Sequence, residues 1–343
     1  MEYPKFTEKH KSLMSKYLTK EVFNKLKGLS TKNNFSIQNV INSGVENPES
    51  GIGAYAGDEE SYAVFADLFN PIIKEYHQFS EQNIHKSNMN FNDLEMENPD
   101  PENKYILSTR IRVGRNLQNF PLGTAISKQQ RLDVESKVSK TLANLKGELE
   151  GNYFPIEGMT KEVSASLIAN HFLFKEGDKY LESAGLNRDW PSGRGIYHNT
   201  NKTFLVWINE EDQLRIISMQ KGGDIAAVFK RLSSAVNLLE VNMDFSFSKR
   251  LGYITSCPTN LGTAMRASVH IKLPKLAKNQ IFFTKITNEN NLQIRGINGE
   301  HTESENGIFD ISNKRRLGVT EVQCVQDMYN GVVALINAEE NLY

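Results

Sequence analysis

Apolar residues recur at helical spacing through the first eighty residues of the chain. The segment before residue 61, SGVENPESGIGAYAGDEE, is interrupted by glycines and by Pro48, which predicts a loop. After Gly57 and Asp58, apolar positions repeat every three or four residues, as on one buried face of a helix. These positions are Phe65, Leu68, Phe69, Ile72, Ile73 and Tyr76. We therefore predict a small, all-helical N-terminal domain over residues 1–85.

A polar segment follows this helical region. Residues 80–104 are rich in Asn and Glu and contain Pro99 and Pro101, a composition typical of a connection between domains. We predict a linker over residues 86–104.

The pattern changes again after the linker. YILSTRIRV alternates like a strand, and TFLVWI and QLRIISM, separated by NEED, predict a hairpin. GYITS and ASVHIKL are two further strand candidates, and helical periodicity covers 128–149, 161–182, 224–240 and 320–337. Strands and helices do not alternate regularly, so the pattern favours an α+β domain with a largely antiparallel sheet over residues 105–343.

Composition narrows the classes of function. The chain has 343 residues, of which 39% are hydrophobic and 24% charged, so it can build a core. A formal net charge of -1 gives no overall reason to expect nucleic acid or an anionic membrane as a partner. The N-terminal residues contain no signal-peptide core, and no stretch reaches the roughly 18 apolar residues of a membrane span. Two cysteines, Cys257 and Cys324, do not make a disulfide framework. We expect a cytoplasmic protein.

Arginines occupy strand segments that are otherwise apolar. Arg110 and Arg112 lie in LSTRIRV, where side chains two residues apart share one face, with Ile111 on the other. Three more arginines lie in similar settings: Arg215 in QLRIIS, Arg266 beside ASVHI and Arg295 in LQIRG. An arginine on a sheet face needs a matched charge, and its planar fork suits phosphate oxygens. The alternative for each arginine is an exposed strand face or an ion pair with the chain's own carboxylates.

Other chemical signals are weaker when taken singly. The chain has neither a Walker A sequence nor a helix opened by G-x-G-x-x-G, so side chains would have to hold a phosphate. Acidic residues cluster at Glu210, Glu211 and Asp212 in the hairpin turn and at Glu300, Glu303 and Glu305 in GEHTESE. Such a cluster is either a solvated turn or a pair of carboxylates that binds a cation such as guanidinium.

A cysteine and two histidines complete the set of candidates. Cys257 opens CPTNLGT and is either a small buried apolar residue or, if placed beside cations, a thiol with a lowered pKa. His171, expected in a helix, and His270, in a strand, have no partner at metal-ligand spacing. We therefore expect no metal ion to be bound directly by the protein.

Several blocks of the sequence resemble the phosphagen kinases, the ATP:guanido phosphotransferases. CPTNLGT resembles the signature around the family's reactive cysteine, and further blocks match in order over about residues 35–335. They are STRIRVGR, HFLFKEGD, WPSGRGIYHN, FLVWINEEDQLRIISMQKGGD, MRASVHIKLPKL, IRG with GEHTESE, and DISNKRRLG. The resemblance implies a small helical domain followed by a larger domain with an antiparallel sheet of about eight strands flanked by helices.

The resemblance also assigns roles to individual residues. It implies contacts with ATP, through phosphate or nucleoside, by Ser108, Thr109, Arg110, Ile111, Arg112, His171, Arg215, Arg266, Ala267, Ser268, Val269, His270, Arg295, Gly296, Ile297, Asn298, Gly299 and Glu300. It implies a site for the guanidino substrate formed by Ser50, Gly51, Ile52, Gly53, Ala54, Tyr55, Glu211, Cys257 and Glu300. Glu211, Glu300 and Cys257 are the implied catalytic residues.

The implied reaction is reversible transfer of the γ-phosphoryl of Mg-ATP to L-arginine, giving phosphoarginine and ADP. Mg²⁺ would be held by phosphate oxygens and water. The short loop ESGIGAY and Glu300 resemble members of the family that act on arginine, whereas AGDEESY is closer to those that act on creatine. The expected partners are ATP or ADP and a free guanidino amino acid, and the expected state is a monomer. The alternatives are a kinase for creatine, taurocyamine or lombricine, a kinase of protein arginine residues, and a non-catalytic phosphate-binding module.

Overall fold

The computed structural model describes residues 2–176, 178–295 and 307–342. The helical region contains five helices: α1 (Leu13–Tyr17), α2 (Lys20–Leu26), α3 (Ile37–Glu46), α4 (Ser61–Val64) and α5 (Ala66–His77). The helix predicted after Asp58 is divided, because the backbone of Phe65 leaves helical geometry between α4 and α5. Its predicted buried face is otherwise correct, except that Tyr76 is exposed.

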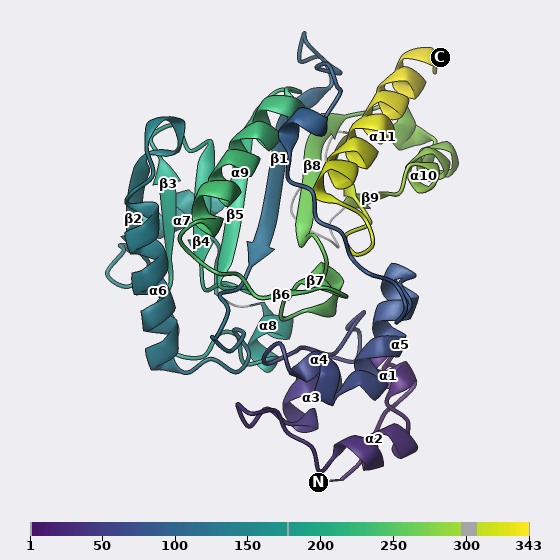
Figure 1. Ribbon diagram of the computed structural model, residues 1–343. Coiled ribbons are helices and arrows are strands. Elements are labelled where there is room, and N and C mark those ends of the chain that lie inside the picture. The colour runs from purple at the N-terminus through teal and green to yellow at the C-terminus, as the bar shows by residue number, and fades with distance from the viewer. Residues whose placement is uncertain (1, 177, 296–306, 343) are drawn as a thin grey trace.

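An eight-stranded antiparallel sheet forms the centre of the remaining chain (Figure 1). Its strand order is β2-β3-β4-β5-β1-β8-β10-β9. The strands are β1 (Ile106–Arg115), β2 (Gly151–Pro155), β3 (Gly195–Asn199), β4 (Phe204–Ile208), β5 (Leu214–Lys221), β8 (Met265–Lys272), β9 (Leu292–Arg295) and β10 (Ile308–Asn313). The α+β prediction and the β4–β5 hairpin are confirmed. The predicted strand GYITS is shorter, since only β7 (Gly252–Tyr253) forms there and pairs with β6 (Phe247–Ser248).

Six further helices accompany the sheet within the residues that the structure describes. They are α6 (Lys128–Leu142), α7 (Lys161–Ala169), α8 (Lys179–Ser183), α9 (Ile225–Glu240), α10 (Gln280–Glu289) and α11 (Glu321–Asn341). Single turns of 3₁₀ helix occur at Phe91–Asp93, Gly147–Leu149, Pro258–Asn260 and Leu276–Lys278. The single helix expected over 161–182 is wrong, because Asn170 and His171 leave helical geometry after α7.

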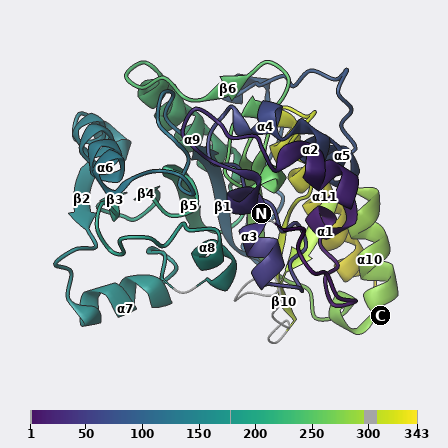
Figure 2. The same ribbon diagram turned by 90° about the horizontal axis from the view of Figure 1, so that it is seen from below.

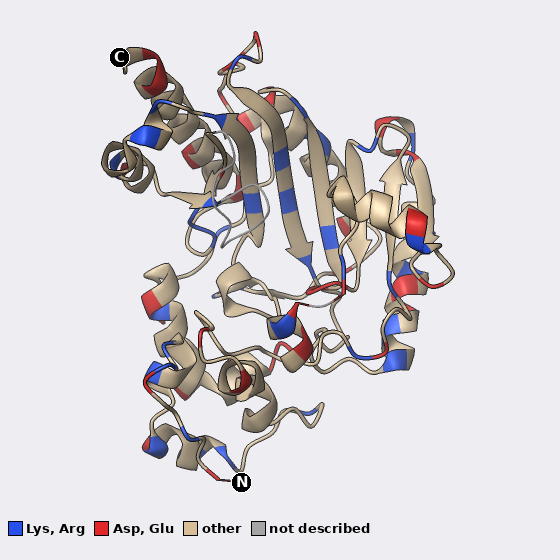
Figure 3. Cartoon of the chain, turned by 180° about the vertical axis from the view of Figure 1, so that it is seen from behind, with Lys and Arg blue, Asp and Glu red and all other residues tan. Residues whose placement is uncertain are grey.

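Helices α9 and α11 cover one face of the sheet, as Figure 1 shows. Inward side chains such as Ile111 and Ala267 pack against Val228 of α9 and Val325 of α11 in a continuous apolar core. Burial of apolar surface contributes about 25 cal/mol per Å². This core therefore stabilises the packing of the helices on one face of the sheet. Polar side chains lie on the opposite face, which Figure 3 views.

The helical region lies below the sheet in Figure 1 and shares an apolar core with loops of the larger part. Leu122, Ile254 and Leu317 from the larger part pack into the cluster formed by the N-terminal helices. Figure 2 shows α3 beside α8. There, Asn42 Nδ2 donates to the carbonyl of Ser183 at 2.9 Å. The two parts of the chain are thus joined by both apolar packing and hydrogen bonds.

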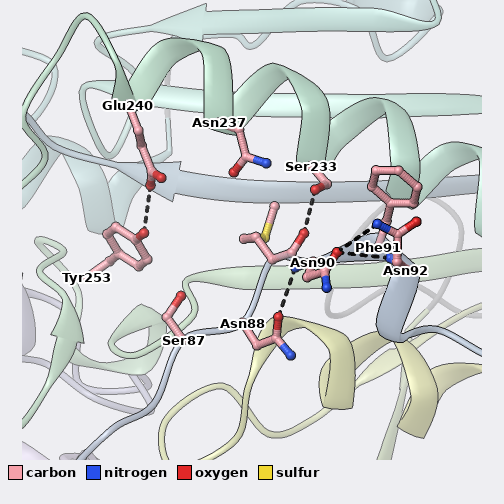
Figure 4. A pocket seen from close by; sticks show the side chains of 10 residues that line it. Ser87, Asn88, Asn90, Phe91, Asn92, Ser233, Asn237, Glu240 and Tyr253 are labelled. Carbon is pink, nitrogen blue, oxygen red and sulfur yellow. Dashed lines mark hydrogen bonds between the residues drawn. The ribbon is translucent and has the colours of Figure 1, made fainter.

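The segment predicted as a linker, residues 86–104, is packed against the larger part. The carboxylate of Glu321, the first residue of α11, accepts hydrogen bonds from Ser87 Oγ and from the backbone N–H of Asn88. Between this segment and α9 lies a polar cavity of about 550 Å³ (Figure 4). Several of its lining groups are bonded within the protein; Tyr253 Oη, for example, donates to Glu240 at 2.7 Å. The lining of this cavity includes none of Arg110, Arg112, Arg215, Arg266 and Arg295.

Candidate active site

The register of the sheet brings five arginines to one face. Arg110 and Arg112 alternate with Ile111, which is fully buried on the helix-covered face. Directly paired residues of antiparallel strands lie on the same face. This face extends over five strands through directly paired residues. The pairs are Arg112 with Arg266, Gly114 with Arg215, Ser108 with His270, His270 with Asp310, and Asp310 with Arg295. Figure 3 views the arginine face, and we use that name for it below.

Trp207 lies between two of these arginines. It pairs with Arg215 across β4 and β5. The guanidinium of Arg110 is 5.3 Å from the Trp207 ring centroid, and that of Arg215 is 5.4 Å from it. A cation over an aromatic ring is held in orientation without an anionic partner. Trp207 therefore keeps the guanidinium of Arg110 in place while its Nε and Nη2 have no hydrogen-bond partner in the described residues.

Positive charge on the arginine face exceeds the negative charge matched to it. In the described part of the chain, no carboxylate lies within ion-pair distance of Arg110 or Arg112. Nε and Nη2 of Arg110 are buried and have no hydrogen-bond partner there. Burial, followed by the charges of Arg215 and Arg266, lowers the pKa of Arg110 to about 10. Buried cations without partners are costly, so this geometry favours a polyanionic ligand.

Asp310 is a buried carboxylate on this face that the sequence analysis did not single out. Its Oδ2 is 2.8 Å from Nη2 of Arg266 and 3.8 Å from Nε2 of His270. Burial raises its pKa, but His270 and Arg266 more than offset this effect and lower it to about 2. The sequence signal was present, because Asp310 is a lone charge between Phe309 and Ile311, the same pattern that marked the arginines.

The β4–β5 turn places carboxylates at one end of the arginine face. Arg215 Nη1 is 2.8 Å from Glu210, and its Nη2 is 3.4 Å from Glu211. Glu211 Oε1 accepts a hydrogen bond from Asn260 Nδ2 at 3.3 Å. Burial, followed by the charge of Asp212, raises the pKa of Glu211 to about 7. Near neutral pH this carboxylate can therefore take up or release a proton.

Asp212 follows Glu211 in the β4–β5 turn, and its carboxylate is held by hydrogen bonds. Its Oδ1 accepts from Asn116 Nδ2 at 2.8 Å and from the backbone N–H of Ser256 at 3.0 Å. Burial raises the pKa of Asp212, and the two N–H donors oppose this effect by favouring the ionised carboxylate. We therefore assign the charge of this pair to Asp212 and the readily exchanged proton to Glu211.

Cys257 lies at the same end of the arginine face. Its Sγ is 3.1 Å from Thr259 Oγ1, and the side chain is buried. Burial, followed by the charge of Glu211, raises its pKa to about 12. Of the two alternatives for Cys257, this arrangement corresponds to the small buried residue, because the main charge that acts on the thiol is a carboxylate. A cation bound between Cys257 and Glu211 would reverse the sign of the local charge.

The loop of residues 50–55 is fixed by the helical region. The carbonyls of Gly51 and Ile52 accept hydrogen bonds from the N–H groups of Leu13 and Met14, both at 2.9 Å. Gly53 has a φ of 75° and approaches Gly44 so closely that a Cβ on Gly44 would lie 2.5 Å from its Cα. Close approach therefore requires glycine at both positions.

The end of this loop reaches the Cys257 site. Ser50 and Ala54 are buried on the side of the helical region. Tyr55 packs with Cys257 and Leu186 in a small apolar cluster. Burial, followed by the charges of Cys257 and Glu211, raises the pKa of Tyr55 well above 10. The loop of residues 50–55 and the acidic β4–β5 turn thus meet at Cys257. Glu49, which directly precedes the loop, forms an ion pair with Lys179.

The structure separates the remaining candidates by face and position. Thr109, Ile111, Ala267 and Val269 are buried away from the arginine face, because alternate residues of a strand point to opposite sides. Ser268 is on the arginine face, and its Oγ donates to the carbonyl of Arg110 at 3.2 Å. His171 lies in the turn after α7 with much of its side chain exposed, and its partial burial, followed by the charges of Arg110 and His270, lowers its pKa. Gly296, Ile297, Asn298, Gly299 and Glu300 lie outside the described residues.

The described part of the chain contains no group of three or more His, Cys, Asp and Glu side chains placed to bind a metal ion. Within the same residues, no helix has the length and apolar character needed to span a membrane.

Comparison with known proteins identifies the family. Residues 8–74 match the ATP:guanido phosphotransferase N-terminal domain, and residues 133–342 match the ATP:guanido phosphotransferase C-terminal catalytic domain. The chain belongs to the ATP:guanido phosphotransferase family. The predicted family and fold are therefore confirmed. The residues 50–55, the acidic β4–β5 turn, Cys257, Arg266 and Asp310 lie within the matched segments, whereas Arg110 and Arg112 of β1 lie between them.

Similar proteins include curated arginine kinases from crustaceans. Arginine kinase Lit v 2.0101 of Penaeus vannamei is 55% identical over 333 residues, which cover 97% of this chain and 94% of that protein. Arginine kinase Cal b 2.0101 of Callinectes bellicosus is 54% identical over 97% of this chain and 93% of its own length.

Solved structures of other members of the family share the fold. The duplicated taurocyamine kinase of Schistosoma mansoni with bound transition state analog components has a TM-score of 0.91 and 43% identity, covering 97% of this chain. This chain spans about half of that duplicated protein, 47% of its length. A lombricine kinase has a TM-score of 0.92 and 38% identity over 99% of this chain and 94% of that protein.

Proposed function

We propose that this ATP:guanido phosphotransferase is an arginine kinase, which reversibly transfers the γ-phosphoryl of MgATP to the guanidinium of L-arginine. The observation that carries the proposal is the juxtaposition of unmatched cations and a readily protonated carboxylate. Arg110 and Arg112 lie on the same sheet face as Arg215, which contacts Glu211 directly. A donor phosphate and a cationic acceptor would meet at that contact.

The arginine face is suited to the polyphosphate of MgATP. Phosphoryl transfer depends chiefly on positioning and charge neutralisation. Buried guanidinium groups held by Trp207 and Asp310 are oriented before the ligand arrives, so they lose little freedom on binding. Mg²⁺ enters as part of the MgATP substrate, because it prefers phosphate oxygens and water to a dedicated protein site.

The acidic end is suited to the guanidinium. In the proposed reaction, a guanidinium nitrogen attacks the γ-phosphorus, the bond from phosphorus to the β–γ bridging oxygen breaks, and ADP leaves. The proton lost by the guanidinium passes to the carboxylate of Glu211, whose pKa of about 7 suits this transfer. Alignment of the reacting atoms supplies a larger part of the acceleration, up to about 7–11 kcal/mol. Glu300, outside the described residues, stays a candidate for a second carboxylate on the guanidinium.

Two observations favour arginine among guanidines. The curated relatives named above are arginine kinases at 54–55% identity over nearly the full chain. The residues 50–55 form a short loop anchored on α1, and only Tyr55 of this loop packs against Cys257. A short loop leaves room above the guanidinium for the larger amino-acid end of arginine.

A panel of guanidines tests the proposal. The protein is incubated with MgATP and arginine, creatine, taurocyamine or lombricine, and ADP release is followed by a coupled assay. We expect arginine to give the highest kcat/KM, and Glu211→Gln to lower kcat by at least a hundredfold with ADP affinity little changed. Preference for another guanidine would replace arginine as the substrate. No phosphorylation of any guanidine would leave a phosphate-binding module.

A further inference from the structure

The turn that carries Cys257 presents several groups to the proposed acceptor site. Cys257 Sγ contacts Thr259 Oγ1, and Asn260 Nδ2 donates to Glu211. The turn itself is a single 3₁₀ turn, Pro258–Asn260, which has little internal hydrogen bonding. We call residues 255–260 the thiol turn. Because so short an element cannot fix its own orientation, contacts from outside must hold it.

The backbone carbonyls of the thiol turn are held one after another. Each carbonyl from Thr255 to Thr259 accepts a hydrogen bond: from Tyr62 Oη at 2.8 Å, Ala56 N at 2.8 Å, Thr255 Oγ1 at 2.8 Å, His77 Nε2 at 2.8 Å and Arg316 Nη1 at 2.9 Å, in chain order. Three of these donors, Ala56, Tyr62 and His77, belong to the N-terminal helical region. The thiol turn is thus held mainly by the helical region.

His77 contacts the carbonyl that lies between Cys257 and Asn260 in the chain. It is the last residue of α5, and its Nε2 meets the carbonyl of Pro258, between Cys257 and Asn260. A carbonyl only accepts hydrogen bonds, so Nε2 must carry the proton. Burial, followed by the charges of Arg316 and His85, lowers the pKa of His77 to about 4. At neutral pH the ring is therefore an uncharged donor.

The other donor to this carbonyl is much weaker. The backbone N–H of Leu261 lies 3.4 Å from Pro258 O, near the limit of a hydrogen bond. Without His77, the Pro258 peptide would lose its main external contact and could rotate. Rotation there would change the direction of the Cys257 side chain on one side and of Asn260, with its bond to Glu211, on the other.

We propose that His77 is a positioning residue, through which the helical region orients Cys257 and Asn260 for phosphoryl transfer. The inference rests on the proposed function for its effect on catalysis. Its structural part, the control of the thiol turn, can be measured without any substrate.

The test compares His77→Phe, which keeps a ring but removes the donor, with His77→Gln, whose amide nitrogen can replace Nε2. His198→Phe is the matched control, because His198 lies on β3 and bonds only to the local carbonyl of Asn199 among the described residues. Alkylation of Cys257 by iodoacetamide is followed in the substrate-free protein by mass spectrometry, which separates it from Cys324. The kcat and both KM values are then measured.

We expect His77→Phe to raise the alkylation rate of Cys257 about tenfold and to lower kcat at least tenfold, with the KM for MgATP unchanged. His77→Gln should restore most of both values, and His198→Phe should match the wild type. If folded His77→Phe keeps the wild-type alkylation rate and kcat, the proposal is overturned. It is also overturned if kcat falls only in proportion to the fraction of the protein that is folded. If His77→Phe does not fold, wild-type alkylation and kcat in His77→Leu would overturn it equally. If no guanidine is phosphorylated, the alkylation result still decides the structural part.

Discussion

Replacing Asp212 by Asn tests whether Glu211 titrates because of its acidic neighbour. Both hydrogen bonds to Asp212, from Asn116 and from the N–H of Ser256, end on the same oxygen, Oδ1. The amide oxygen of Asn can accept both, so Asp212→Asn removes the negative charge and leaves the contacts in place. Substitution at this position is therefore an electrostatic change with little rearrangement.

The expected magnitude follows from the causes of the shift. Burial, the largest cause, and then Asp212 raise the pKa of Glu211 from 4.5 to about 7. Removing Asp212 removes only the second cause, and we expect the pKa to fall by about 1, to near 6, which corresponds to about 1.4 kcal/mol. At pH 6 the ionised fraction of Glu211 would rise from about one tenth to about one half, or roughly fivefold.

The assay is the pH dependence of kcat/KM for arginine at saturating MgATP. In the wild type, kcat/KM should fall below pH 7, because protonated Glu211 cannot accept the proton of the guanidinium. In Asp212→Asn this fall should begin about one pH unit lower. The terminal phosphate of ATP also titrates near this range, but it does so equally for both proteins, so the difference between the profiles reports on the enzyme.

The control is Asp133→Asn on the exposed side of α6, which should leave the profile unchanged. An acid limb that stays in place in Asp212→Asn, or moves to higher pH, would refute the assignment of the titrating proton to Glu211.

Two further substitutions address the arginine face. Asp310→Asn should lower the free energy of unfolding in urea at pH 7 by about 2 to 4 kcal/mol, since it leaves Arg266 buried beside a neutral group. The pKa of Asp310 in the folded protein is depressed to about 2. The difference in the free energy of unfolding between Asp310→Asn and the wild type should therefore narrow as pH falls from about 4 toward 2. A difference that stays constant over this range would contradict the ion pair. Arg110→Met should weaken ADP binding in calorimetry by about 10- to 100-fold and should raise the melting temperature, because it removes a buried cation without a partner. Unchanged ADP affinity would remove Arg110 from the phosphate site.

Sequence reasoning located the arginine face because strand alternation is a local rule. Arg110 and Arg112 with Ile111 between them follow directly from a period of two, and the β4–β5 hairpin was legible from its turn. Which strands are neighbours is not local. The placement of Arg266 opposite Arg112 needed the register of β1 and β8, for which the sequence has no short-range signal.

The errors arose where three-dimensional surroundings decide the chemistry. For Cys257 the sequence leaves open a buried thiol and a thiol beside cations, and only the fold shows that burial, followed by the charge of Glu211, raises its pKa. His171 was placed in a helix because apolar spacing continues past Ala169, whereas the backbone turns at Asn170. Asp310 is a lone acid in the apolar strand segment FDISN. The rule that a charge on a sheet face needs a matched charge applies to it as it does to the arginines, so the sequence carries a signal for this residue too.

The arginine face is assembled from the first and nearly the last strands of the larger part of the chain. β1 begins at Ile106 and β9 ends at Arg295, and both contribute guanidinium groups. During synthesis, a nascent chain cannot present this constellation until some three hundred residues have left the ribosome. Nucleotide would consequently bind only chains that extend past β9, and its binding energy would protect these from proteolysis while leaving shorter products unprotected.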